Sequence, residues 1–216
     1  MRETTRKKER LKLKNIILEN IYYNLKAYCI VTIIFLIGII AGVIFINHIN
    51  EGQMGEIKEY IQQFITAIKG DYEINKGELL KKSLIENFKL ALGMWFIGLS
   101  VIGIPIVLGI ILFRGFCIGY TVSSAIAILG LQKGSLFFVT TILAQNIVFI
   151  PVIITLAVSG MKLYKSIMKD KRKENIKLEI VRHTIVSIIL FALLVVSSLI
   201  EVYISTNLLT ACIGFF

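Results

Sequence analysis

Residues 27–49 read AYCIVTIIFLIGIIAGVIFINHI, an uncharged apolar stretch that only Thr32, Asn47 and His48 interrupt. As a helix rising about 1.5 Å per residue, this stretch is long enough to cross a hydrocarbon core of roughly 30 Å. The chain has two prolines and no short alternating strands, which favours helices over a barrel. Hydrophobic residues make up 56% of the 216 positions, above the roughly 45–50% of soluble domains. The sequence therefore predicts an all-α, polytopic membrane helical bundle.

Working outward, residues 90–160 are apolar apart from Arg114, Lys133 and a few polar side chains, which is too long for one crossing. Three spans are expected there, with turns at Arg114 and at Gln132–Lys133–Gly134. The middle span is short and either crosses or re-enters the membrane. The predicted transmembrane helices are residues 27–49, 90–113, 115–131, 135–160 and 183–203.

Charge predicts the orientation of these five spans. Residues 1–26 and 161–183 each carry eight Lys/Arg against three acidic residues, whereas residues 50–89 carry six against seven. By the positive-inside rule, 1–26 and 161–182 are cytoplasmic, and 50–89 and the tail 204–216 lie outside. This places the amino terminus inside and the carboxyl terminus outside. The net charge of +10 is then explained by contact with membrane lipid, and no nucleic acid is needed as a partner.

The outer segment 50–89 contains an apolar stripe at helical spacing, which predicts one face of an amphipathic helix. A second short helix is expected around 77–88. The stripe either packs against the other helices, which we favour, or offers a surface to a partner. Its residues are Ile57, Tyr60, Ile61, Phe64, Ile65 and Ile68.

The residue types that intramembrane enzymes need are scarce. The only aspartates, Asp71 and Asp170, fall on opposite sides of the predicted membrane, and so do the only histidines, His48 and His183. A serine nucleophile such as Ser100 would lie about 15 Å from either histidine, too far for a general base. We therefore expect no enzymatic activity, no cofactor and no metal.

Small residues in the predicted spans favour close helix packing. Gly38 and Gly42 form one G-x-x-x-G motif, and Gly115 and Gly119 form another. Missing side chains let helix backbones approach closely, so we expect intramolecular packing, with a homo-oligomer interface as the alternative. Gly98 and Gly103 belong to the same class of candidate.

Prolines and amides are the remaining candidates within the spans. Pro105 and Pro151 each remove a backbone donor and predict kinks. Gln145 and Asn146 lie near a predicted midplane, where interhelical hydrogen bonding is the favoured role and a polar transport path the alternative. Arg114 and Glu201 are expected near the interfaces, which leaves no ionisable group at depth and argues against transport.

Three stretches together resemble the stage II sporulation protein M family: GLSVIGIPI at 98–106, FRGFCIGYTV at 113–122 and AQNIVFIP at 144–151. The order of basic amino terminus, first span, outer loop and four further spans is also similar. The resemblance implies a non-catalytic scaffold of the engulfment machinery in the mother-cell septal membrane. Its implied partners are two peptidoglycan-degrading enzymes, stage II sporulation proteins D and P. The competing hypothesis is a permease-like subunit that moves a small solute or lipid.

Overall fold

The structure, a computed structural model, describes residues 24–70, 75–100, 103–169 and 173–215. Most of the basic segment expected at 1–26 lies outside the described residues, as do Asp71 and Asp170. Every element in the described part of the chain is helical. In chain order the elements are α2 (Leu25–His48), α3 (Glu51–Lys69), α4 (Lys76–Gly98), α5 (Gly103–Phe138), η1 (Val139–Leu143), α6 (Ala144–Lys169), α7 (Lys173–Leu199), η2 (Ile200–Ser205), α8 (Thr206–Cys212) and η3 (Ile213–Phe215).

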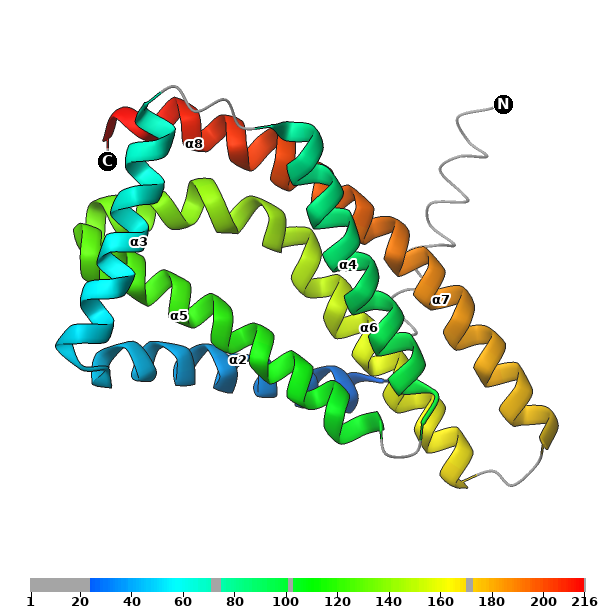
Figure 1. The fold of residues 1–216 in the computed structure, drawn as a ribbon. Helices are drawn as coiled ribbons and strands as arrows, with labels where there is room; N and C mark the ends of the chain where they lie inside the picture. The colour runs from blue at the N-terminus through cyan, green and yellow to red at the C-terminus, as the bar shows by residue number, and fades with distance from the viewer. Residues whose placement is uncertain (1–23, 71–74, 101–102, 170–172, 216) are drawn as a thin grey trace, which may run out of the picture.

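The long helices α2, α4, α5, α6 and α7 alternate in direction and pack into one bundle (Figure 1). The shorter helix α3 crosses one end of this bundle, close to α5 and to the carboxyl end of the chain. Asparagine caps separate α3 and α4 from what precedes them. The Asn50 side chain accepts a hydrogen bond from the Gln53 N–H at 2.8 Å, and Asn75 accepts from the backbone N–H groups of Gly77 and Glu78.

The expected helix over 90–113 is wrong, because α4 ends at Gly98 and α5 begins at Gly103. Gly103 lies so close to the Ile97 carbonyl that a Cβ would collide with that oxygen. Pro105 falls in the first turn of α5, where its missing N–H would have no helical partner, so it starts a helix instead of kinking one. The predicted turn at Arg114 is also wrong: α5 is helical through that residue.

The reversal at the other end of α5 lies close to its predicted place. Gly130 has φ 81° and ψ 167°, which breaks the helix inside α5 two residues before the expected turn at Gln132. The chain then doubles back, so that Gly134 faces Ile126 with no room for a Cβ. Residues 103–129 and the helix leading into α6 therefore form an antiparallel hairpin (Figure 1).

Three helical stretches are long and apolar enough to cross a membrane: Leu25–His48, Gly103–Met168 and Ile176–Cys212. The second contains the reversal at Gly130, so one continuous apolar stretch supplies both arms of the hairpin. Helix α4 is not among these stretches. Its residues 76–89 include Lys76, Glu78, Lys81, Lys82, Glu86 and Lys89. Even so, α4 packs against α6 and α7 and contributes Ala91 and Met94 to the apolar core.

The most extensive helix contact joins α2 and α5, and the two G-x-x-x-G motifs meet there. A Cβ on Gly38 or Gly42 would collide with the α5 backbone, at the carbonyls of Leu112 and Phe116 respectively. Conversely, Gly115 and Gly119 lie against the carbonyls of Phe35 and Ile39. Each motif is thus covered by the other, and none of the four glycines is left on a free surface.

Candidate functional site

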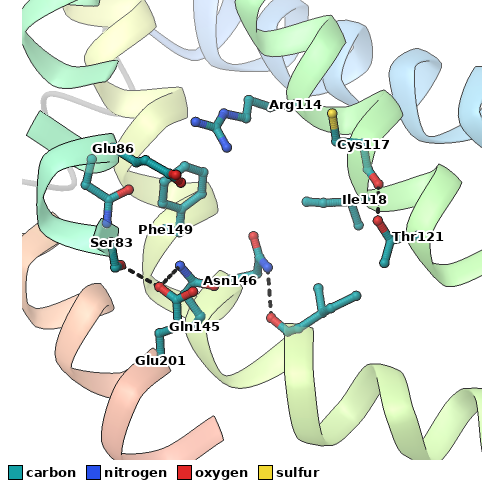
Figure 2. Close-up of a pocket in the computed structure, with 12 residues that line it drawn as sticks. Ser83, Glu86, Arg114, Cys117, Ile118, Thr121, Gln145, Asn146, Phe149 and Glu201 are labelled. Atoms are coloured by element: carbon teal, nitrogen blue, oxygen red, sulfur yellow. Dashed lines mark hydrogen bonds between the residues drawn. The ribbon is translucent and has the colours of Figure 1, made fainter. Parts of the chain in front are cut away.

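Polar and charged side chains from four helical regions surround a cavity of about 200 Å³ inside the bundle (Figure 2). Helix α4 contributes Ser83, Glu86 and Asn87, and α5 contributes Arg114. The remaining lining residues come from α5, η1, α6 and η2: Cys117, Ile118, Thr121, Ile142, Gln145, Asn146, Phe149 and Glu201. The site combines one guanidinium, two carboxylates and three amides, of which Asn87 is buried and Glu86 is exposed.

Glu201 is the centre of a hydrogen-bond network that joins three helical regions. Its Oε2 accepts from the Ser83 hydroxyl of α4 at 2.5 Å and from the Gln145 amide of α6 at 2.7 Å. Both donors point at the same oxygen in Figure 2. Two donors on one oxygen hold this carboxyl group in place, so it forms a fixed part of one wall of the cavity. No hydrogen bond to its other oxygen, Oε1, is found among the described residues, and Glu201 lines the cavity.

Asn87 lies one turn after Ser83 and ties the same wall to α7. Its side-chain amide donates to the Ser198 hydroxyl at 2.8 Å, and both residues are buried. The hydroxyl of Ser197, the residue before Ser198 on α7, donates to the backbone carbonyl of Gln145 at 3.2 Å. Buried polar groups are costly unless they are paired, so these bonds explain how a polar seam is accommodated between apolar helices.

Arg114 reaches the cavity from α5. Its guanidinium carbon lies 5.2 Å from the centre of the Phe149 ring, a cation–π contact. Within the residues that the structure describes, neither Glu86 nor Glu201 forms an ion pair with Arg114. The salt bridge that is found joins Arg182 to Glu179, outside the cavity, with Nη1 and Oε1 3.7 Å apart. The guanidinium and the Glu86 carboxylate both point toward the open space in Figure 2.

The position of Arg114 along its helix differs from the expected one. It follows Gly103 by eleven residues, about 16 Å along α5, and so lies near the middle of the arm that ends at Gly130. Because the turn was expected at Arg114 itself, the sequence interpretation placed this charge at an interface. The argument against a polar path used a turn at Arg114, and α5 has no turn there.

Two π-helical segments flank the cavity. Segment η1 (Val139–Leu143) ends two residues before Gln145, and η2 (Ile200–Ser205) contains Glu201. The two segments contact each other. Such segments are rare and frequently occur at functional sites, because they widen a turn and re-aim its side chains. Nothing in the hydrophobic pattern of the sequence indicates them.

The predicted amides have different roles. Gln145 forms the interhelical bond to Glu201 described above, whereas the Asn146 amide donates to the Ile142 carbonyl of its own helix at 2.8 Å. Both line the cavity, and Pro151 lies inside α6 near them. Ser83, Glu86 and Asn87 were missed because residues 76–89 were assigned to the outer loop. Their i, i+3, i+4 spacing on one face of a helix is the signal that could have found them.

The apolar stripe of α3 lies only partly against the bundle. Ile61 and Ile65 are buried, and the Phe64 ring packs edge-on against Phe137 with centroids 6.1 Å apart. Tyr60, in contrast, is 72% exposed. Between α3 and the α5–η1 region is a mainly apolar groove of about 470 Å³. Its lining includes Ile57, Tyr60, Ile61 and Phe64, whereas Ile68 packs against the cluster of Ala125, Phe137 and Leu209.

A serine–histidine pair joins α6 and α7 away from the cavity. The Ser159 hydroxyl lies 2.9 Å from Nδ1 of His183. The other ring nitrogen, Nε2, has no partner among the described residues and faces the close contact of Gly98 with Gly160, where an added Cβ on Gly98 would lie 3.0 Å from it. A small pocket of about 30 Å³ is lined by both residues, and the hydrogen bond between them joins α6 to α7. The absence of enzymatic activity stays a prediction.

Comparison with known proteins gives one match. The family model for stage II sporulation protein M matches residues 31–206. That range runs from the first helix to the start of α8 and includes every residue that lines the cavity. No curated protein and no solved structure matches the chain. With its apolar helices and this match over most of its length, the chain is an all-helical membrane protein that belongs to the stage II sporulation protein M family.

Proposed function

We propose that this protein is a non-catalytic scaffold of the sporulation machinery. It recruits peptidoglycan-degrading enzymes, stage II sporulation proteins D and P, to the septal membrane that engulfs the forespore. Family membership supports a role in sporulation. The observation that carries the docking proposal is the half-covered stripe of α3, where buried Ile61 and Ile65 anchor the helix and Tyr60 remains exposed beside an apolar groove.

The proposed topology has five crossings, by α2, α4, α5, α6 and α7. The alternating directions of these helices support it, and the boundary between the second and third crossings then lies between the end of α4 at Gly98 and the start of α5 at Gly103, and not at Arg114. The amino terminus is then cytoplasmic and α3 lies on the outer side, where enzymes that act on the cell wall have their substrate. The basic residues of 161–182 remain inside, in agreement with the positive-inside rule.

A pull-down from sporulating cells tests the docking proposal. The double substitution Ile57→Asp and Tyr60→Asp places charge on half-buried Ile57 and exposed Tyr60, which both line the groove. It is expected to reduce recovery of both hydrolases by about tenfold or more, since removing an apolar anchor from an interface costs on the order of a kcal/mol or more. Gln62→Asp, on the exposed side of the same helix, is the matched control and should leave recovery unchanged. Equal recovery with the double variant and the control would contradict docking at α3.

The charged cavity favours a second candidate, a permease-like subunit for a small solute or lipid. Helices that meet around mid-membrane polar groups form the sites of many transporters. Flux into proteoliposomes that depends on Arg114 and Asn146 would support this candidate, and hydrolase recovery that depends on α3 would support the scaffold. The two measurements involve different residues, so one result does not determine the other.

A further inference from the structure

The charges around the cavity are gathered but not paired with each other. Arg114 carries one positive charge against the carboxylates of Glu86 and Glu201, and no salt bridge joins them in the described part of the chain. A charge inside a membrane bundle is costly and normally finds a partner. Exposed Glu86 and half-buried Arg114 and Glu201 line the same cavity of about 200 Å³. A ligand that carries both charges could therefore reach all three groups from this cavity.

We propose that this cavity binds a zwitterionic group, with its anionic oxygens on Arg114 and its primary ammonium on Glu86 and the free oxygen of Glu201. A guanidinium presents donors in a planar fork that suits carboxylate or phosphate oxygens. An ammonium has three donors and suits carboxylate and amide acceptors, which the opposite wall supplies. Asn146 adds a further amide oxygen, since its nitrogen is engaged with Ile142.

The cavity adjoins the apolar groove beneath α3. Thr121 and Ile142 line both. Cavity and groove together fall in the range of small-molecule sites, roughly 300–1,000 Å³, in which a few polar groups orient an otherwise apolar ligand. Because the charged cavity lies next to the apolar groove, a zwitterion with an apolar substituent fits the pair: its charges would lie in the cavity and its substituent in the groove. Two sources carry that chemistry: a free apolar amino acid, and the headgroup of a phosphatidylethanolamine lipid.

Binding requires neither transport nor hydrolase docking, so the test uses a binding readout. Purified protein in detergent is heated with leucine, with isocaproate, which lacks the ammonium, or with isoamylamine, which lacks the carboxylate. Ligands that bind the folded state raise the thermal midpoint with increasing concentration. A parallel arm measures, by native mass spectrometry, the retention of phosphatidylethanolamine and phosphatidylglycerol from nanodiscs that contain equal amounts of each.

We expect one zwitterion, leucine or phosphatidylethanolamine, to bind at least about tenfold more tightly than its single-charge counterparts, because one charge-assisted hydrogen bond is worth about that factor. Leucine binding identifies a free solute, and selective retention of phosphatidylethanolamine identifies the headgroup. The inference is overturned if neither zwitterion binds, or if isocaproate, isoamylamine or phosphatidylglycerol binds equally well. This comparison uses the wild-type chain and so does not depend on the folding of a variant.

Variants then assign the binding to the cavity. Arg114→Gln and Glu201→Gln should each weaken zwitterion binding by about tenfold or more. Glu78→Gln, on the same helix as Glu86 but outside the cavity, and Arg182→Gln, in a surface ion pair, are matched charge controls and should bind like wild type. Binding that survives both cavity substitutions would place the zwitterion elsewhere and overturn the inference.

Discussion

One face of helix α5 packs tightly against α2, and another face lines the cavity. On one, Gly115 and Gly119 bring the backbone against α2 with no space for a single carbon atom. On the other, Arg114 and Thr121 border an open cavity lined by charges. Adjacent residues in the chain thus serve a closed seam and an open site. The seam holds the helix in place, and this fixed position sets the distance of Arg114 from the carboxylates across the cavity.

The largest expected effect is at the seam. Gly119→Ala adds one carbon that would collide with the Ile39 backbone, which cannot move aside as a flexible side chain can. We expect a loss of about 3 kcal/mol, at the upper end for overpacking. The thermal midpoint in detergent, followed through the fluorescence of the single tryptophan, Trp95, measures it.

Gly109→Ala is the matched control for this variant, since it lies on the same helix with nothing within 4 Å of the added carbon. It should leave the midpoint unchanged or raise it slightly, because alanine favours helix over glycine. Equal losses for the two variants would show that glycine at 119 matters for some reason other than close packing.

A smaller effect is expected at the wall of the cavity. Glu201→Leu removes the acceptor shared by Ser83 and Gln145 and leaves both donors unpaired, at a cost of about 2 kcal/mol. Glu201→Gln keeps an oxygen in place and should cost clearly less in the same melting experiment. If leucine were tolerated as well as glutamine, the network would not support the wall.

The smallest effect is expected at Arg114. Arg114→Leu removes a cation–π contact with Phe149 but also a half-buried charge without an ion pair, and these changes offset each other to within about 1 kcal/mol. Its neighbour Gly115→Ala, which would meet the Phe35 carbonyl, should cost far more. If Arg114→Leu and Gly115→Ala lowered the free energy of unfolding by similar amounts, the cavity residue would contribute to stability as much as the helix contact does, and the comparison would fail.

Much of the fold could be predicted from local pattern. The first apolar stretch, 27–49, corresponds closely to α2, and the stripe that begins at Ile57 lies on one helix, α3. The turn near Gln132 lies two residues from its observed place at Gly130. In each case a charge, a glycine or a change of period marks the boundary in the sequence itself.

The cavity could not be predicted in the same way. Within residues 90–113 hydrophobicity is uniform, so it does not fix where the chain turns, and an arginine was the most plausible marker. A turn at Arg114 would put this residue at the end of a helix, whereas it lies near the middle of the arm between Gly103 and Gly130. Glu201 and Ser83 are 118 positions apart in sequence. They meet because α4 packs against α7 and against η2, which follows α7 and contains Glu201. Tertiary packing of this kind leaves no local signal.

The π turn at Ile200–Ser205 has a consequence for how the family's sequences can change. A π turn holds one residue more than an α turn, and one residue corresponds to a rotation of about 100° about the helix axis. Deleting a single residue there would restore an ordinary helix and would turn either Glu201 or the helix beyond it by that angle. A one-residue insertion or deletion near η2 would therefore rotate part of the helix and change which side chains face the cavity.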